Sequence, residues 1–361
     1  MKKSIYLLGL CCAGTLAPAF GSPMDAFLSA NQNNVVGAVE LEAAYDLVNS
    51  TVDVFKIRNK DAIYAGTNVG DYRGGHLRAG VALTPRIWID GGFWERQLDY
   101  RDDTVKIKTW QLAAQYKLLD GVGYRPSIAL RAGAWGNYSN QLKKTSVTSV
   151  LGQTLNSVTV DSPKDNQFQI DLIGTSAIFA HTELSMFVGA GTSRVSVGDV
   201  SATSTVGGCP YNLALGATEV VATLARPCGN IASSSITVPN SAYGIDINNE
   251  AQYRANFAHA GLMLNWKKDD WQLRGGYQYQ YLKRQHIDDA ISARGGSSYQ
   301  SNHTLVGEVK YQVIKEAAVF LRGQYMTNQF VGEIQFAYNT LTARRFGKRY
   351  GFLSAGVLVT F

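Results

Sequence analysis

Long segments in which apolar and polar residues alternate are the feature that most restricts the fold of this chain. In WQLRGGYQYQYLKRQ, residues 271–285, the odd positions up to 281 are Trp, Leu, Gly and Tyr, while the even positions up to 280 are Gln, Arg and Gly. Because successive side chains of a strand point to opposite faces, such a segment is a β-strand with two unlike faces. The segment by itself does not distinguish aromatic residues that face a protein core from aromatic residues that face lipid.

Twelve such segments follow one another, and the connections between them alternate in length. They cover residues 36–48, 75–83, 86–100, 104–118, 126–139, 166–179, 182–197, 251–267, 271–285, 298–313, 317–331 and 349–361. Connections after even-numbered segments are short, and those after odd-numbered segments are mostly long. Short turns at one end and long loops at the other are typical of a transmembrane barrel. A β-sandwich, the alternative for alternating strands, predicts no such asymmetry.

The N-terminus has the pattern of a secretory signal peptide over residues 1–21. Lys2 and Lys3 precede a short apolar run, which includes Cys11 and Cys12, and small residues lie before Ser22. Residues 22–35 are then a periplasmic segment, expected to be disordered or to form a brief helix around 24–29. After the signal peptide no window has 18 consecutive apolar residues, so no transmembrane helix is predicted.

The C-terminus stops on Phe361, inside an alternating segment that includes Leu353, Val357 and Val359. This end resembles the last strand of Gram-negative outer-membrane β-barrel proteins, a porin-like class. The resemblance implies an all-β fold, a transmembrane antiparallel barrel of about twelve strands over residues 36–361, located in the cell outer membrane. It also implies that Phe361 is part of the signal read by the barrel-assembly machinery. The aromatic face of 271–281 is then expected to contact lipid.

If the polar faces point inward, the lumen carries charges of both signs. The predicted pore-lining residues are Glu40, Glu42, Asp46, Arg78, Arg131, Asp171, Arg274, Glu308, Lys310 and Arg322. Opposed charges around a water-filled lumen favour a passive channel for small hydrophilic solutes. The alternative is that the charges pair with one another and plug the lumen. Twelve strands lie between barrels with filled interiors and open porins, so both interpretations stand.

The longest predicted loop, residues 198–250, contains both cysteines that lie outside the signal peptide. Cys209 and Cys228 are 19 positions apart in an oxidising compartment, which predicts a disulfide within the loop. The loop is otherwise rich in Ser, Thr, Ala and Gly, and it is expected to cap the barrel or to be mobile. This loop supports a second functional hypothesis: a non-conducting structural or adhesive surface protein that acts through its extracellular loops on a host or phage partner.

A barrel-embedded hydrolase is the third hypothesis. An omptin-like protease would use His286, Asp288 and Asp289 together with Asp102 and Asp103, but strand alternation points adjacent carboxylates apart. A lipid hydrolase would use a close pair, either His181 with Ser185 or Ser301 with His303, and neither pair has the surroundings of a known lipid enzyme. We therefore expect no enzymatic activity, no cofactor and no metal site.

The remaining partners are inferred from charge. Without Lys2 and Lys3 the chain has 32 basic and 28 acidic residues, a balance that does not point to nucleic acid. The pairs Arg344-Arg345 and Lys348-Arg349 are expected at the outer rim, where they would hold lipopolysaccharide phosphates of the outer-membrane lipid. His259 is predicted to lie at the lipid-facing girdle or at a subunit contact, which leaves a homo-oligomer open.

Overall fold

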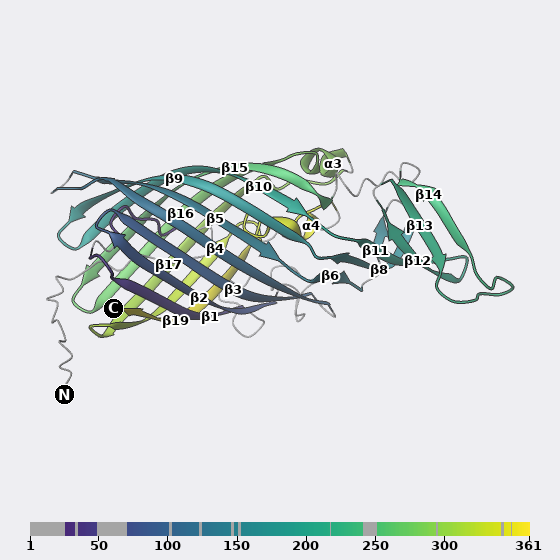
Figure 1. Cartoon of the computed structure of the whole chain (residues 1–361), viewed down its shortest axis with the longest axis horizontal. Helices are drawn as coiled ribbons and strands as arrows, with labels where there is room; N and C mark the ends of the chain where they lie inside the picture. The colour runs from purple at the N-terminus through teal and green to yellow at the C-terminus, as the bar shows by residue number, and fades with distance from the viewer. Residues whose placement is uncertain are drawn as a thin grey trace, which may run out of the picture.

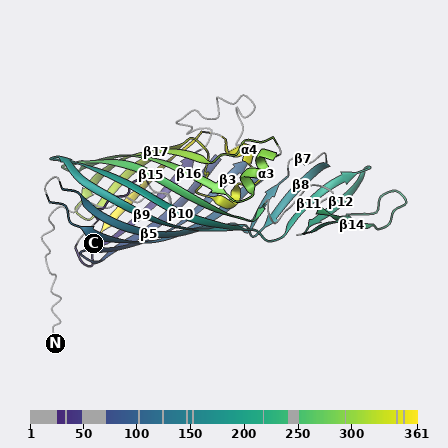
Figure 2. The ribbon, with the colours of Figure 1, turned by 90° about the horizontal axis from the view of Figure 1, so that it is seen from above.

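Twelve antiparallel strands close into a barrel, and a separate seven-stranded sheet projects beyond one of its ends (Figures 1 and 2). The computed structural model describes residues 26–32, 35–48, 71–100, 103–122, 125–145, 148–150, 153–216, 218–240, 251–293, 295–340, 343–347 and 349–361. The predicted signal peptide, residues 1–21, lies outside the described residues.

Each predicted segment forms one strand of the barrel, with bounds that differ from the prediction by a few residues. In chain order the barrel strands are β1 (Val39–Val48), β2 (Asp71–Thr84), β3 (Ile87–Tyr100), β4 (Asp103–Leu119), β5 (Ser127–Tyr138), β9 (Lys164–Phe179), β10 (Thr182–Ser196), β15 (Tyr253–Lys268), β16 (Trp271–Arg284), β17 (Ser301–Ile314), β18 (Ala317–Met326) and β19 (Tyr350–Thr360). Neighbours in sequence pair throughout, and β1 closes the barrel against β19. The predicted fold class is confirmed.

The two ends of the barrel differ in their connections. Short turns join β2 to β3, β9 to β10, β15 to β16 and β17 to β18 at the end where the N- and C-terminal strands meet, which we call the terminal end. At the seam there, Val39 and Phe361 exchange two backbone hydrogen bonds of 3.1 and 2.9 Å. The longer connections and the second sheet lie at the opposite end, which we call the loop end (Figure 1).

The outer surface of the barrel is apolar, as the alternation in β16 predicts. Trp271 and Tyr281 are 49% and 44% exposed, whereas Gln272 and Gln278 on the alternate face are buried. Ten residues of a strand tilted by about 40° rise roughly 25 Å along a barrel axis, which is the height of the apolar band of outer-membrane barrels. Trp271 and Tyr281 therefore stand at the two borders of such a band.

The second sheet is built by two neighbouring hairpins of the loop end. Its strands are β6 (Gln141–Lys144), β7 (Thr148–Val150) and β8 (Gln153–Asp161), which follow β5, and β11 (Val200–Val206), β12 (Cys209–Leu215), β13 (Glu219–Leu224) and β14 (Ser235–Pro239), which follow β10. β8 and β11 pair with one another and join the two halves. We call these seven strands the surface sheet.

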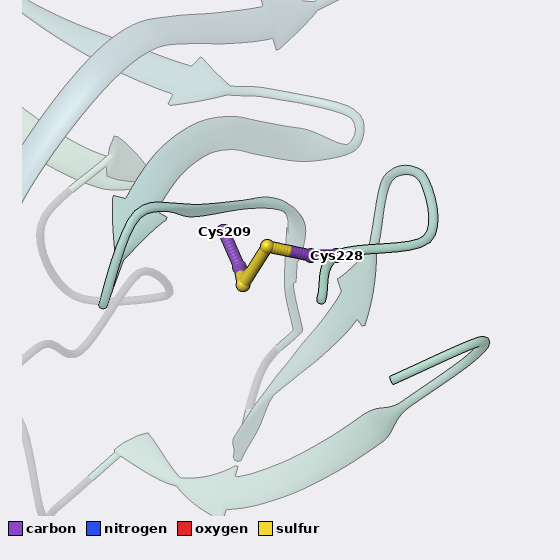
Figure 3. Close-up of a disulfide and its surroundings, with 2 residues drawn as sticks. All are labelled: Cys209 and Cys228. Carbon is purple, nitrogen blue, oxygen red and sulfur yellow. A yellow bond between two sulfur atoms is a disulfide. The ribbon is translucent and has the colours of Figure 1, made fainter. Parts of the chain in front are cut away.

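The surface sheet corrects the expectation for the loop 198–250. The predicted disulfide is confirmed, because Cys209 and Cys228 are bonded, with 5.6 Å between their Cα atoms (Figure 3). The described part of the loop is neither a cap nor unstructured, since β11 to β14 extend away from the barrel mouth (Figure 2). Threonine and valine, which are frequent in these strands, favour extended structure over coil.

Two other segments enter the lumen. Residues 26–32 form neither a helix nor a strand and are largely buried, so the expected helix or disorder around 24–29 is wrong from Ala26 onward. The described residues of the connection between β18 and β19, 327–340, 343–347 and 349, also fold inward for the most part. They include a 3-10 turn, η2 (Gln335–Ala337), and a short helix, α4 (Ala343–Phe346). A third short helix, α3 (Ile287–Ala293), follows β16. None of the described helices is long and apolar enough to cross a membrane.

Candidate functional site: the lumen and its two closures

A chain of ion pairs runs along one side of the lumen, from β16 to β2. The Arg274 guanidinium bonds the Glu308 carboxylate, and Arg322 donates to Glu308 at 2.8 Å and to both oxygens of Glu42 at 3.2 Å. Both ring nitrogens of His76 then bridge Glu42, at 2.9 Å, and Asp46, at 3.0 Å. Each of these groups is buried, so the pairing compensates the loss of water around the charges.

A second cluster lies on the adjoining strands. Asp90 on β3 accepts two hydrogen bonds from Arg131 on β5, at 2.6 and 2.9 Å, and one from Arg78 on β2, at 3.4 Å. With Glu40, Asp171 and Lys310, which are also buried on the inner face, these two clusters account for all ten predicted pore-lining residues. The structure places all ten inside the barrel; whether they line a conducting pore stays a prediction.

His259 lies inside the barrel, and its predicted place on the lipid-facing girdle is wrong. Its Nε2 is 2.5 Å from Oδ1 of Asp171, and its ring packs between Phe187 and Phe257. Gly189 on β10 lies between Asp171 and His259, and a side chain at this position would collide with both. The odd positions of β15 face inward although many are apolar, so a rule that sends polar residues to the lumen fails there.

Residues 26–32 close the terminal half of the lumen. The Ala30 amide donates to Oγ1 of Thr175 at 2.8 Å, Nε2 of Gln115 donates to the Ser29 carbonyl at 2.9 Å, and Asn31 donates to Glu183 at 3.0 Å. These partners belong to β9, β4 and β10. The segment is therefore held by scattered side-chain contacts and not by strand pairing.

The ring of Phe27 connects residues 26–32 with the first ion-pair cluster by packing against two of its arginines. Its ring centroid is 4.7 Å from the guanidinium carbon of Arg274 and 5.9 Å from that of Arg322. The face of an aromatic ring attracts a cation, and the attraction is stronger where water is excluded. Gly276 on β16 allows this approach, because a Cβ there would lie 2.7 Å from the Ala26 carbonyl oxygen.

The inward connection between β18 and β19 closes the loop half of the lumen with an apolar core. Its buried side chains include Phe330, Val331, Ile334, Phe336, Tyr338 and Phe346. They pack against side chains from around the barrel wall, among them Tyr72, Leu98, Ile107, Trp135, Tyr253, Leu282 and Phe352. We call its described residues, 327–340, 343–347 and 349, the inward loop.

Polar contacts fix the inward loop to opposite sides of the wall. Arg96 on β3 pairs with Glu333 at 2.7 Å, and the Phe336 amide donates to Asp165 on β9 at 3.0 Å. The Tyr253 hydroxyl on β15 lies within hydrogen-bond distance of the carbonyls of Gln335, at 2.6 Å, and Tyr338, at 2.8 Å. These contacts carry the loop across the full width of the lumen.

Tyr338 lies where the inward loop reaches the wall at β15 and β16. The Arg284 guanidinium lies 3.9 Å from its ring centroid, and its hydroxyl accepts the Tyr299 amide at 2.8 Å. Burial raises the pKa of the Tyr338 hydroxyl above its ordinary value. The phenol therefore stays neutral and serves as a packing and hydrogen-bonding group.

These apolar residues correct the expectation of a polar lumen. The two ion-pair clusters lie toward the terminal end, while the loop half of the inner wall carries many aromatic and aliphatic side chains that face the inward loop, together with the Arg96–Glu333 pair. Sequence reasoning missed Phe27, Phe330, Phe336 and Tyr338. Phe336 and Tyr338 lie in a predicted connection, Phe27 lies in the predicted N-terminal segment, and Phe330 lies at the end of the predicted segment 317–331, beyond the end of β18 at Met326. Their signal was the presence of large apolar residues outside the regular part of the strands.

The residues of the hydrolase hypothesis are not assembled in the described part of the chain. Asp288 is buried and bonds Arg284, Ser298 and Gln300, so its oxygens serve to hold α3. His303 is on the outer face, where its Nδ1 is 2.8 Å from the Tyr277 hydroxyl. Asp102 and the side chain of Asp103 lie outside the described residues. Among those described, no group of His, Cys, Asp and Glu is arranged to hold a metal ion.

Comparison with known proteins finds similar solved structures but no family. No family model matches the chain, and no curated protein matches it. Solved structures with a similar fold include the translocator domain of the autotransporter NalP from Neisseria meningitidis, with a TM-score of 0.44, 10% identity and coverage of 90% of this chain and 88% of that one. The NanC porin has a TM-score of 0.42, 7% identity and coverage of 89% and 98%.

The CymD monoaromatic hydrocarbon channel has a TM-score of 0.40, 11% identity and coverage of 92% of this chain and 91% of that one. These neighbours are outer-membrane β-barrels. The role of this barrel does not follow from them. Because outer-membrane barrels have short periplasmic turns and longer extracellular loops, we call the terminal end periplasmic and the loop end extracellular.

Proposed function

We propose that this protein is an outer-membrane barrel whose lumen is closed and that it acts by presenting its surface sheet outside the cell. The observation that carries the proposal is the inward loop, which crosses the lumen from Arg96 on β3 to Tyr253 on β15 and packs a hydrophobic core there. This favours the non-conducting surface protein over a permanently open channel.

The apolar core makes spontaneous opening rare. Burying one large apolar side chain contributes about 1.5–3 kcal/mol, and the inward loop buries at least six: Phe330, Val331, Ile334, Phe336, Tyr338 and Phe346. Withdrawing the loop into water would therefore cost on the order of 10 kcal/mol, even after allowance for incomplete exposure. An equilibrium of that size leaves a negligible open population.

The charges of the periplasmic half support the same proposal. Arg274, Arg322 and Arg131 donate to buried carboxylates and are not arranged as a free track for a solute. A buried ion pair is costly to break, because removing one partner strands the other in a site without water. Such pairs brace the wall.

The surface sheet is the part of the protein that the barrel would present outside the cell. It rises beyond the barrel on two adjacent hairpins, and the Cys209–Cys228 disulfide ties the start of β12 to the connection after β13 (Figure 3). A ring of this size removes roughly 3 kcal/mol of chain entropy from the unfolded loop. A sheet reinforced in this way is suited to a structural or adhesive contact at the cell surface.

A gated passage for small hydrophilic solutes is the second candidate, favoured by one observation. The periplasmic half of the lumen is wide enough to hold a stretch of polypeptide, residues 26–32, in addition to the wall side chains. A space of that width would pass a small solute if both closures withdrew. In that case Arg274 and Arg322 would contribute to ion selectivity.

Conductance of the refolded mature protein in planar bilayers tests the proposal. The wild type is expected to be silent, as is a variant that lacks residues 22–32, because the inward loop still seals the extracellular half. Replacing residues 329–338 by a short Gly-Ser linker should produce discrete conductance steps. Regular steps from the wild type would contradict the closed lumen; reversal potentials shifted by Arg274→Ala with Arg322→Ala would then establish the channel.

Presentation by the surface sheet needs its own measurement. Whole cells that carry the wild-type barrel should bind a matrix or cell surface, and deletion of residues 205–232 should abolish that binding while the barrel still folds. Cys209→Ser with Cys228→Ser removes only the disulfide and keeps every residue of the strands, so it should weaken the binding less than the deletion does. Equal binding by the deletion variant across a panel of surfaces would overturn the presenting role.

A further inference from the structure

We propose that Lys164, Arg194, Arg254 and Lys283 form a binding site on the outer barrel wall for the phosphate groups of lipopolysaccharide. The four side chains come from the adjacent strands β9, β10, β15 and β16, and all are exposed. This site is independent of whether the lumen conducts. We call the four residues the basic patch.

Strand register brings the basic patch together. Arg194 and Arg254 are directly opposite one another across β10 and β15. Lys164 pairs with Ser196, two positions beyond Arg194, and Lys283 pairs with Asn256, two positions beyond Arg254. Directly opposed residues have Cβ atoms about 5 Å apart, and diagonal neighbours about 7–8 Å. Each lysine is therefore a diagonal neighbour of one arginine, and the four charges form one continuous row across β9, β10, β15 and β16.

An exposed pair of opposed arginines requires an explanation. Like charges directly opposite on a sheet repel one another and destabilise it. In the described part of the chain, none of the four side chains forms an ion pair, and the outward positions between them on these strands carry no acid. A bound anion would turn this repulsion into a favourable interaction, and arginine binds phosphate through two parallel hydrogen bonds.

The height of the patch on the barrel identifies the anion as part of a lipid. Lys283 is two positions beyond Tyr281, the exposed aromatic residue at the extracellular border of the apolar band, and Tyr138 is directly opposite Lys164. Below the patch the same face exposes Phe168, Val188 and Leu262, which are suited to acyl chains. A ligand that meets both surfaces has phosphates above and hydrocarbon below, which describes a lipid of the outer leaflet.

A second group of exposed lysines has an acidic residue directly opposite and serves as a control. Lys106 and Lys108 also face outward near the extracellular end, on β4. Lys108 is directly opposite Glu95 of β3, so its charge already has a neighbour of the opposite sign. The candidates from the sequence, Arg344, Arg345 and Lys348, have side chains outside the described residues, and of that group the structure describes only Arg349, which is exposed.

Binding of defined lipids to the protein refolded without lipopolysaccharide tests the site. The probes are lipid A with both phosphates and the same lipid A without phosphate, added to the protein in detergent and counted as adducts by native mass spectrometry. The wild type should bind the phosphorylated form at least about tenfold more tightly, because each charge-assisted hydrogen bond contributes to affinity. Arg194→Gln with Arg254→Gln should remove that preference.

The controls separate the alternatives. Lys106→Gln with Lys108→Gln makes the same change in charge and should leave the preference within about twofold of the wild type, as expected for neutralised surface charges. Equal binding of the two lipids, or equal loss in both variants, would overturn the site, and full competition by millimolar inorganic phosphate would show a free-anion site instead of a lipid site. If the arginine variant does not fold, Lys164→Gln with Lys283→Gln makes the same test at the edge of the patch.

Discussion

Arg322 reaches past β19 to hold Glu42, a residue 280 positions away, with two hydrogen bonds of 3.2 Å. The two residues lie on β18 and β1, the strands on either side of β19 at the barrel seam. Because β1 lies at the start of the barrel sequence and β19 at its end, this ion pair spans the seam at which the barrel is closed. The seam is therefore braced from inside by charge as well as by backbone pairing.

Arg322→Ala is expected to destabilise the barrel by about 3–5 kcal/mol, because Glu42 and Glu308 would lose a buried partner. Urea unfolding in detergent, followed by tryptophan fluorescence, measures the change. Arg86→Ala is the control: Arg86 and Asp120 form an ion pair more than half exposed, which should contribute less than about 1 kcal/mol. Equal effects of the two variants would show that the seam pair does not brace the barrel.

Gly276→Val is expected to displace residues 26–32 from the lumen. A Cβ at this position would meet the Ala26 carbonyl at 2.7 Å and the Phe27 ring at 3.2 Å, and the backbone oxygen cannot yield as a flexible side chain would. The Ala30 amide, bonded to Thr175, should then exchange hydrogen faster. Gly275→Val on the outward face meets no atom within 4 Å and should leave that exchange rate unchanged.

Tyr253→Phe is expected to loosen the inward loop at a cost of about 1–3 kcal/mol, because it leaves two buried carbonyls without this partner. Limited proteolysis of the loop at increasing temperature should show cleavage of the variant before the wild type. Tyr45→Phe changes a tyrosine that is 56% exposed on the outer face and should not alter the cleavage pattern. Identical cleavage of Tyr253→Phe and wild type would mean that the apolar core alone holds the loop.

Cys209→Ser with Cys228→Ser should destabilise the surface sheet and spare the barrel. The disulfide joins residues 19 positions apart, for which the entropy model gives roughly 3 kcal/mol. Proteolysis should therefore remove part of residues 200–239 from the variant under conditions that leave the wild type intact. The barrel should keep its resistance to unfolding in SDS at room temperature; loss of that resistance would show that the sheet and the barrel fold as one unit.

The strands were predictable because they obey a local rule. In β16, Trp271, Gln272 and the residues after them alternate between lipid and lumen with a period of two, and a short window of the strand is enough to display that period. The same rule failed for β15, where Phe257 and Met263 face inward beside His259. These apolar residues pack in a protein core inside the barrel. The alternation rule assumes lipid on one face of a strand and water on the other, so it does not predict such a core.

The site was less accessible to sequence reasoning, since it depends on segments that have no periodicity. The sequence predicts a tail at residues 26–32 and a loop for most of the inward loop. No local pattern indicates that either segment enters the lumen. Their positions follow from long-range contacts, such as Phe27 with Arg274 and Glu333 with Arg96. The surface sheet is similar, because β8 and β11 pair across two different hairpins.

By itself, the sequence determined a twelve-stranded barrel, the lipid-facing side of each long strand except β15, and the disulfide between Cys209 and Cys228, because alternation and cysteine count act over short stretches of chain. The tertiary structure decided what fills the barrel. Glu42 could line a pore or bind Arg322, and Phe336 could be exposed to solvent or close the lumen. Which of these happens depends on strands that meet only in the closed barrel, so no single segment of the chain carries the information.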